Sequence, residues 1–374
     1  MLLGNRKRAA RWLIIIAVFA MLASACSSDD GDSGGEDLTP VTLQMQWFTQ
    51  AQFAGYYAAV AEGYYKDAGL DVTILEGGVD IVPATVIESG AADFALSWAI
   101  RALGPREEGA NVTNISQVFE RSATLQVSFV DQGITSPADL AGKNVGNWGF
   151  GNEAELFAGI RQAGLDPATD VNLVQQQFDM LALIAGDIDA AQAMTYNEYA
   201  QVLETVNPDT GELFLPSDLS VIDWNDVGTA MLQDAIWADA DRLENDAEYR
   251  ATAVKFVEAS IRGWVFCRDN FDACVDHVLA AGPTLGESHQ AWMLNEINNL
   301  IWPASNGVGV MDEALWNQTV KNAVDGAVLK GEPTAGAFVT DINAEALANL
   351  KADGVDVDGN GWSPRTIELR EGGE

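Results

Sequence analysis

The chain has 374 residues and a formal net charge of −35 at pH 7, with 20 Lys and Arg residues against 55 Asp and Glu residues. Nucleic-acid binders need basic patches, so this balance argues against a nucleic-acid partner. The excess of acidic residues also argues against a general scavenger of anions, and it keeps a protein soluble while repelling an anionic membrane surface.

Residues 1–25 have the pattern of a signal peptide. Their apolar run, 12–25, has 14 residues, fewer than the roughly 20 of a membrane-spanning helix, and follows a basic n-region of Arg6, Lys7, Arg8 and Arg11. The run ends in MLASAC, with a small residue at each of the three positions before Cys26. This resembles a bacterial lipoprotein processing site and predicts that Cys26 is lipidated. The alternative is an ordinary signal peptide with an incidental cysteine.

Residues 26–40 are predicted to form a flexible tether behind the lipidated cysteine. The segment SSDDGDSGGEDLTP has no apolar side chain except Leu38, so it cannot repay the entropy lost on ordering. A lipid and a tether predict an extracytoplasmic protein that touches the membrane through its anchor alone. A merely disordered mature terminus would have the same structure.

The mature chain then begins with a β-α-β-α-β pattern. Residues 41–47 alternate strictly between apolar and polar side chains, which predicts a strand. The pattern continues with helices predicted at 53–64, ending before Gly69, and at 81–88, and with strands predicted at 71–75 and 93–98. Strands that alternate with helices in this way form a parallel sheet.

The same pattern restarts after SPADLAGK at 136–143. Strands are predicted at 144–148, 171–174 and 190–194, and helices at 153–162, 180–185 and 197–206. A short motif marks the correspondence, because G-x-x-D-x-A occurs at 90–95 and again at 186–191, 96 residues later. The sequence therefore predicts two similar lobes.

The C-terminal third is predicted to be mostly helical, with helices near 246–262, 287–301, 312–328 and 343–351. The first lobe needs more than its N-terminal segment to cover both faces of its sheet, and these helices can supply the cover. We therefore expect the chain to leave lobe 1 near Val130 and to return near 229–237. Lobe 1 is then 41–130 plus 235–374, lobe 2 is 131–234, and two crossing strands form the hinge.

Aromatic residues stand at the predicted ends of four strands: Trp47, Trp98, Trp148 and Tyr196. Sheets of this kind bind ligands outside the carboxyl ends of their strands, so the two edges would face each other across a cleft. Aromatic faces there could sandwich a planar ring, with offset stacking worth about 0.5–1.5 kcal/mol per pair beyond burial. Ordinary core packing is the alternative for each residue.

Amides and a carboxylate accompany these aromatic residues. Gln46, Gln50 and Gln52 flank the first tryptophan, and Asn147 precedes the third; amides both donate and accept, which suits a neutral heterocycle. In MTYNEY, Asn197 and Glu198 follow a predicted strand, and the carboxylate could accept a hydrogen bond from a ring amino group or pair with a cationic ring. Alternatively, Glu198 only occupies a first helical turn, where the macrodipole favours acids.

Anion-binding features are few. The Gly-rich turn at 146–155 runs into a predicted helix, but Glu153 and Glu155 would repel a phosphate there, so close approach of the backbone to a small ligand is the better interpretation. Arg101 and Arg121 follow predicted strands and could meet a ligand carboxylate, although such residues are more often solvated.

No catalytic site, metal site or cofactor is predicted. The two histidines, His277 and His289, lie in the helical tail without a metal-ligand cluster or nucleophile pattern. DVDGNG at 356–361 begins like a calcium loop, but Ile367 stands where the loop needs Glu and Pro364 intervenes, which favours a plain turn.

Two cysteines, Cys267 and Cys274, remain once Cys26 is lipidated. An even count outside the cytoplasm permits a disulfide, which would clip a helical corner. The alternative is two buried free thiols.

Several stretches together carry a family resemblance: QMQWFTQAQFAGYYAAVAEGYYKDAGLDVTILEGG, VIESGAADFALSW, SPADLAGKNVGNWGFGNE and DIDAAQAMTYNEY. They resemble bacterial solute-binding proteins of ABC transporters, in the branch related to binders of thiamine pyrimidine precursors. The resemblance implies an α/β type II periplasmic-binding-protein fold, with two βαβ-based lobes joined by two crossing strands, that closes over its ligand and delivers it to a permease with its ATPase. It also implies aromatic stacking on a pyrimidine, with matching positions at Trp47, Tyr196, Glu198 and the Asn147–Trp148 loop.

We therefore expect a monomeric lipoprotein that supplies an importer with a planar N-heterocycle, such as formylaminopyrimidine or hydroxymethylpyrimidine. Relatives imply riboflavin or, more distantly, a sulfonate as alternatives, and a sensor ectodomain would share the fold. A eukaryotic branch is a self-consuming enzyme that makes the pyrimidine from pyridoxal phosphate and its own histidine, with a cysteine-rich motif. Here no cysteine lies between Cys26 and Cys267, and neither predicted lobe core has a histidine, so we expect no enzyme.

Overall fold

This computed structural model describes residues 38–374. Its first strand, β1 (Thr39–Gln44), forms where the apolar side chains begin after the tether. Val41 and Leu43 are buried along it. The strand begins at Thr39, so the last two residues of the predicted tether belong to β1. The predicted signal peptide and the lipidation site Cys26 lie outside the described residues.

The sheet of lobe 1 has five strands in the order β2-β1-β3-β10-β4. β1 pairs in parallel with β2 and β3, whereas β10 runs antiparallel to both β3 and β4. The further strands of this sheet are β2 (Leu70–Leu75), β3 (Phe94–Trp98), β4 (Val112–Ser116) and β10 (Asp234–Asp239).

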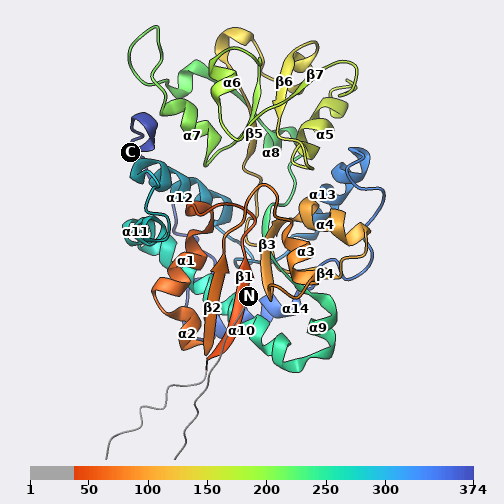
Figure 1. The fold of residues 1–374 in the computed structure, drawn as a ribbon, viewed down its shortest axis with the longest axis vertical. Helices are drawn as coiled ribbons and strands as arrows, with labels where there is room; N and C mark the ends of the chain where they lie inside the picture. Colours follow the sequence, from red (N-terminus) through yellow and green to blue (C-terminus); the bar gives the residue numbers. More distant parts are fainter. Residues whose placement is uncertain (1–37) are drawn as a thin grey trace, which may run out of the picture. The chain divides into compact units, whose positions relative to one another are not determined.

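Helices from both ends of the described chain cover the two faces of this sheet (Figure 1). Alternate side chains of β3 enter different hydrophobic clusters, with Phe94 and Leu96 on one face and Ala95 on the other. The helices of lobe 1 are α1 (Ala54–Ala61), α2 (Tyr64–Asp67), α3 (Pro83–Glu88), α4 (Ala99–Glu107), α9 (Ala240–Asn245), α10 (Ala247–Asp269), α11 (Phe271–Ala281), α12 (Glu287–Ile301), α13 (Glu313–Asp325) and α14 (Asp341–Ala352). Among residues 38–374, no helix has the length and apolar character that crossing a bilayer requires.

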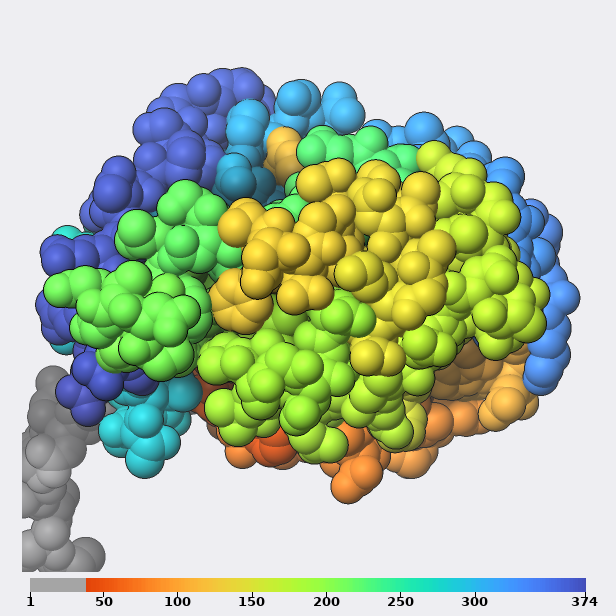
Figure 2. All heavy atoms as spheres, turned by 90° about the horizontal axis from the view of Figure 1, so that it is seen from above, coloured from red at the N-terminus to blue at the C-terminus, as the bar shows by residue number. Residues whose placement is uncertain are grey.

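Lobe 2 repeats the strand order of lobe 1. Its antiparallel sheet β8-β5-β9 and its parallel pair β6-β7 are connected where Gly146 N donates to Ala190 O (2.7 Å), which gives the order β7-β6-β8-β5-β9. Figure 2 shows these yellow and green segments over the centre of one face, with blue C-terminal segments along its edge. The elements from β5 to α8 are β5 (Thr124–Phe129), β6 (Asn144–Asn147), β7 (Asn172–Gln175), β8 (Ala191–Met194), β9 (Leu219–Asp223), α5 (Ala154–Gln162), α6 (Leu181–Ile184), α7 (Glu198–Leu203) and α8 (Trp224–Val227).

The G-x-x-D-x-A motif performs the same structural task in each lobe. Asp93 Oδ2 accepts a hydrogen bond from Thr42 N (2.9 Å), and Asp189 Oδ2 accepts one from Asn144 N (2.7 Å). The backbone N–H of each aspartate donates in return to the carbonyl of the same partner residue, at 3.0 and 2.8 Å. The motif thus aligns the start of β3 with β1 and the start of β8 with β6.

Two segments connect the lobes, 117–123 between β4 and β5 and 224–233 between β9 and β10. They lie side by side, because Gln233 Nε2 donates to Ser122 Oγ (3.0 Å) and to Thr124 Oγ1 (2.7 Å). These crossing segments are the only described links along the chain between the two sheets.

The first crossing comes earlier than the boundary predicted after Val130. β5 pairs with β8 and β9 and with no strand of lobe 1, so strand pairing assigns segment 124–129 to lobe 2. Its partners are far away in the sequence, and local periodicity contains no information about which sheet receives it. The second crossing was predicted near 229–237, and the chain re-enters the sheet of lobe 1 at β10.

Candidate functional site

A cavity of about 450 Å³, counting the space open to solvent at its mouth, lies between the lobes. Lobe 1 lines it with Gln46, Trp47, Gln50, Gln52, Trp98 and Arg101. Lobe 2 lines it with Trp148, Asn152, Phe178, Met194, Tyr196, Asn197 and Glu198.

The four aromatic residues predicted at strand ends all line this one cavity. Trp47 meets Phe178 edge-to-face, with ring centroids 4.6 Å apart and planes at 61°. Trp148 lies on the same phenyl ring, with centroids 5.9 Å apart and planes at 21°. Phe178 therefore links an indole of lobe 1 with an indole of lobe 2, and the lobes are in contact beside the cavity.

A buried carboxyl group, Asp234, organises the lobe 1 wall. Its Oδ1 accepts hydrogen bonds from Gln46 Nε2 (2.6 Å) and Trp98 Nε1 (2.7 Å), and its Oδ2 accepts one from Gln52 Nε2 (2.9 Å). Burial raises the pKa of Asp234 to about 7, although the three donors and the guanidinium of Arg101 favour the ionised form. The wall thus contains a carboxyl group that titrates near neutral pH.

The predicted glutamines are therefore fixed within this wall. Gln46 Oε1 accepts from Trp98 N (3.1 Å), and Gln52 Oε1 accepts from Gln50 Nε2 (2.7 Å). Both amides thus use a donor and an acceptor within the protein. They orient the indole of Trp98 and the carboxyl group of Asp234.

The opposite wall is formed by the first turn of α7. Glu198 is buried, with Oε2 accepting from Met194 N (2.9 Å) and Oε1 from Asn197 Nδ2 (2.9 Å). Burial raises the pKa of Glu198 above its usual value, and these hydrogen bonds oppose the shift. Each carboxylate oxygen retains lone-pair capacity for a further donor. Tyr196 adds a buried phenol to the same wall.

Asn147 was predicted to contact a ligand, but it does not line the cavity. It ends β6, and its Nδ2 lies 3.5 Å from Val174 O. Side chains alternate along an extended chain, so the position of Trp148 in the cavity leaves its neighbour on the other side. Arg121, another sequence candidate, instead donates to the carbonyls of Asn299, Leu300 and Pro303.

Sequence reasoning missed three residues that line the cavity, Asn152, Phe178 and Met194. It also missed Asp234, which lies behind the lobe 1 wall and is hydrogen-bonded to it. Asp234 carries a detectable signal, because it interrupts the apolar run AMLQDAIWA at 230–238, where a charge is out of place. Phe178 is similarly a lone aromatic residue in the polar stretch QQQFD. Asn152 and Met194 have no such signal.

A second buried carboxyl group, Glu155, lies at the hinge. From α5 of lobe 2 it accepts hydrogen bonds from Met231 N (2.6 Å) and from Ser122 Oγ (3.1 Å). It therefore contacts both crossing segments at once. Burial raises the pKa of Glu155 to about 7 against the effect of these hydrogen bonds.

At the rim of the cavity, α12 of lobe 1 contacts α7 of lobe 2. His289 Nδ1 lies 2.9 Å from Glu204 Oε1, and its Nε2 lies 3.0 Å from Asn197 Oδ1. Trp292 Nε1 donates to Thr195 O (3.0 Å) in the same region. These contacts join the lobes next to residues that line the cavity.

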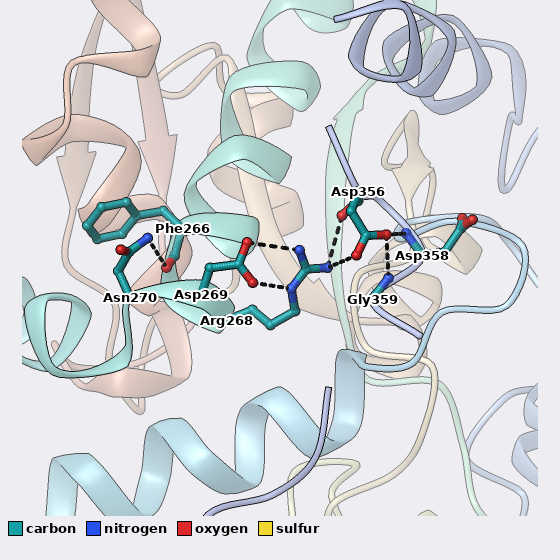
Figure 3. Close-up of polar contacts among 7 residues, drawn as sticks. All are labelled: Phe266, Arg268, Asp269, Asn270, Asp356, Asp358 and Gly359. Carbon is teal, nitrogen blue, oxygen red and sulfur yellow. Dashed lines mark hydrogen bonds and ion pairs between the residues drawn. The ribbon is translucent and has the colours of Figure 1, made fainter. Parts of the chain in front are cut away.

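The remaining sequence candidates lie together at the end of α10. Cys267 and Cys274 form a disulfide between α10 and α11, with Cα atoms 5.0 Å apart. Figure 3 shows Arg268 between Asp269 and Asp356, where Asp356 Oδ1 also accepts from the backbone N–H of Gly359 (3.0 Å). The first carboxylate of the DVDGNG turn is thus engaged by protein groups. Among residues 38–374, no group of three or more His, Cys, Asp or Glu side chains is placed to hold a metal ion.

Comparison with known proteins is consistent with this architecture. A family model described as NMT1/THI5 like matches residues 50–273. A formylaminopyrimidine-binding protein of Halalkalibacterium halodurans is 26% identical over 268 residues, which cover 71% of this chain and 78% of the relative. The riboflavin-binding protein RibY of Chloroflexus aurantiacus is 27% identical over 315 residues, covering 79% and 84%.

Among solved structures, the periplasmic aliphatic sulphonate-binding protein SsuA of Escherichia coli has a TM-score of 0.58 at 17% identity. The superposition covers 88% of this chain and 94% of that protein. The likeness establishes the fold, and the expectation of an α/β periplasmic-binding-protein fold is confirmed.

Proposed function

The chain belongs to the NMT1/THI5-like family, and from this premise we propose that it is the solute-binding protein of an ABC importer. Its solute is a planar nitrogen heterocycle, of which a thiamine pyrimidine precursor of the formylaminopyrimidine or hydroxymethylpyrimidine type is the best candidate. The named relatives that bind formylaminopyrimidine and riboflavin support this class of solute.

The observation that carries the proposal is the composition of the cavity walls. Trp47 and Trp98 face it from lobe 1, and Trp148, Phe178 and Tyr196 face it from lobe 2. A flat ring between such walls gains stacking on both sides, and its burial removes apolar area from water. The ring therefore binds best when both lobes contact it.

The carboxyl group of Glu198 favours a solute that carries N–H donors. Glu198 lines the cavity, and a ring amino group or ring N–H can donate to it. A sulfonate would meet this carboxyl group with the wrong charge, so a sulfonate is the weaker candidate. Riboflavin remains the alternative solute because of the RibY relative.

Uptake then proceeds by hinge closure. The two crossing segments bend, the solute stacks on one lobe and recruits the other, and the binding energy shifts the balance toward the closed form. The Trp47–Phe178 contact and the His289–Glu204 pair belong to that closed form. The permease, powered by its ATPase, recognises the closed shape.

We further propose that the protein works outside the cytoplasm as a monomer, held to the membrane by a lipid on Cys26. It is not an enzyme in this proposal. The residues that line the cavity include neither histidine nor cysteine. A sensor ectodomain would use the same cavity but would depend on a receptor in place of a permease.

Native mass spectrometry of protein purified without refolding tests the proposal, since a retained solute identifies itself by mass. We expect an aminopyrimidine, and calorimetric titration of the stripped protein then measures its affinity. Glu198→Gln should weaken an aminopyrimidine at least tenfold and affect a ring without the amino group far less. Retention of a sulfonate or of a non-aromatic solute would overturn the proposal, and retention of riboflavin would select the alternative.

A further inference from the structure

We propose that Arg101 recognises a carbonyl or carboxylate oxygen on the solute. The cavity would then select a two-ended ring, with an amino group toward Glu198 and an oxygen acceptor toward Arg101. This inference rests on the proposed function and refines the class of solute.

The position of Arg101 supports this role. It lies in the first turn of α4, directly after the end of β3, and its side chain lines the cavity. The residue is half-buried, and within residues 38–374 its guanidinium group makes no hydrogen bond or ion pair. Desolvation lowers the pKa of Arg101, which reflects the cost of removing this cation from water.

Asp234 does not neutralise this cation by direct contact. It attracts Arg101 across the wall, but its own hydrogen bonds go to Gln46, Gln52 and Trp98. All three donors are neutral, and the described structure shows no ion pair between the carboxyl group and the guanidinium. Arg101 therefore keeps its five N–H donors for another acceptor.

The neighbouring amides of lobe 1 carry no charge. Gln46 and Gln52 also hydrogen-bond within the protein through both the oxygen and the nitrogen of their side chains, as described above. Arg101 is thus the one cavity-lining group of lobe 1 that combines a positive charge with uncommitted donors among the described residues. A guanidinium fork matches a planar carbonyl or carboxylate group better than a point charge does.

The opposite wall supplies the complementary chemistry. Glu198 is an acceptor when ionised and faces the same cavity from α7. A ring with only donors would leave the guanidinium unpaired on binding, and a ring with only acceptors would confront the carboxylate. A solute with both groups satisfies both walls.

The test uses three probes that share one ring: 4-amino-5-aminomethyl-2-methylpyrimidine, its N-formyl derivative, and 4-amino-2-methylpyrimidine-5-carboxylate. Calorimetry compares wild type, Arg101→Gln and Arg101→Lys, with Arg161→Gln on the exposed surface of α5 as the matched control for charge removal. Circular dichroism and thermal melting report the fold of each variant.

We expect Arg101→Gln to lose about 10- to 100-fold on the formyl and carboxylate probes, as is typical when a hydrogen bond to a charged group is removed. The loss on the aminomethyl probe should stay within threefold, and Arg161→Gln should match wild type on all three. Arg101→Lys should recover part of the carboxylate binding and little of the formyl binding, because it keeps the charge without the fork. If the glutamine variant fails to fold, this difference for the lysine variant still decides the question.

Equal losses on all three probes, or the same losses in Arg161→Gln, would overturn the role of Arg101 and leave the proposed function standing. Failure of every probe to bind wild type would reject the aminopyrimidine solute and the inference built on it. The carboxylate and formyl arms also separate an acidic solute from a neutral one.

Discussion

Replacement of Trp47 by Ala should weaken solute binding without unfolding the protein. The indole is only partly buried in this structure, so its removal leaves the core of lobe 1 largely intact. It meets Phe178 of the other lobe at 4.6 Å and also lines the cavity. The substitution therefore removes one contact with the solute and one contact between the lobes.

Two aromatic contacts set the expected size of the effect. Each is worth about 0.5–1.5 kcal/mol beyond area burial, so the pair contributes about 1–3 kcal/mol to the closed complex. Since 1.4 kcal/mol is a factor of ten in affinity, we expect Kd to rise by about 5- to 150-fold. Phe178→Ala should have a similar effect because it removes the other half of the same contact.

Isothermal titration calorimetry with the retained solute measures Kd, and small-angle scattering with and without solute measures closure. Tyr64→Ala is the matched control, because Tyr64 is another partly buried aromatic residue of lobe 1 and does not line the cavity. We expect this control to change Kd by less than threefold. An unchanged Kd for Trp47→Ala, with normal folding, would refute the assignment of this cavity as the binding site.

Three further predictions concern stability and closure. Burial raises the pKa of Glu155 from its usual 4.5 to about 7. Protonation of Glu155 therefore stabilises the folded state in full below about pH 4.5, and this contribution to the free energy of unfolding is lost as pH rises through 7. Glu155→Gln, which never ionises, should therefore exceed wild type by about 1–3 kcal/mol in urea unfolding at pH 8 and equal it at pH 4.5; lower stability at pH 8 would contradict this. Replacing Cys267 and Cys274 by Ser should cost about 2 kcal/mol, and thiol counting with and without reductant serves as the control. His289→Ala should speed solute dissociation about fivefold or more in stopped-flow measurements, because the bonds to Glu204 join the lobes; an unchanged rate would exclude this pair from closure.

Local patterns in the sequence predicted most of the regular structure. The strand expected at 93–98 corresponds to β3, and the helix expected at 287–301 has the observed bounds of α12. Both segments have clear periodicity and clear ends. In contrast, α4 was not predicted, since Gly104 and Pro105 in its second half are typical of a loop.

Pairing between distant segments was harder to foresee. β5 joins lobe 2 through antiparallel pairing with β8 and β9. The residues of β5 themselves do not indicate which strands it pairs with. The same difficulty explains the boundary predicted after Val130. The topology depends on two strands next to the crossings: β5 pairs within lobe 2, and β10 pairs within lobe 1. Only the folded structure shows this exchange of strands between the sheets.

Most aromatic residues and most polar residues of the candidate site were accessible from the sequence, whereas the hydrogen bonds among the polar residues were not. Aromatic residues at strand ends follow from the βαβ pattern, and all four line the cavity. Asp234 comes from a strand that returns to lobe 1 late in the chain. The sequence offered Arg101 and Arg121 on equal terms, and only the structure shows that Arg101 lines the cavity. Hydrogen bonds that use up Gln46 and Gln52 depend on geometry that composition does not encode.

The exchange of strands between the sheets also governs the order in which the protein can mature. Every strand of the second sheet lies within one continuous segment, 124–223, whereas the first sheet stays incomplete until β10 (Asp234–Asp239) has been added. A polypeptide that emerges N-terminus first, from a ribosome or through a translocation pore, thus holds all the strands of the later lobe before the earlier lobe has its fifth. The half that is begun first is necessarily the half that is finished last.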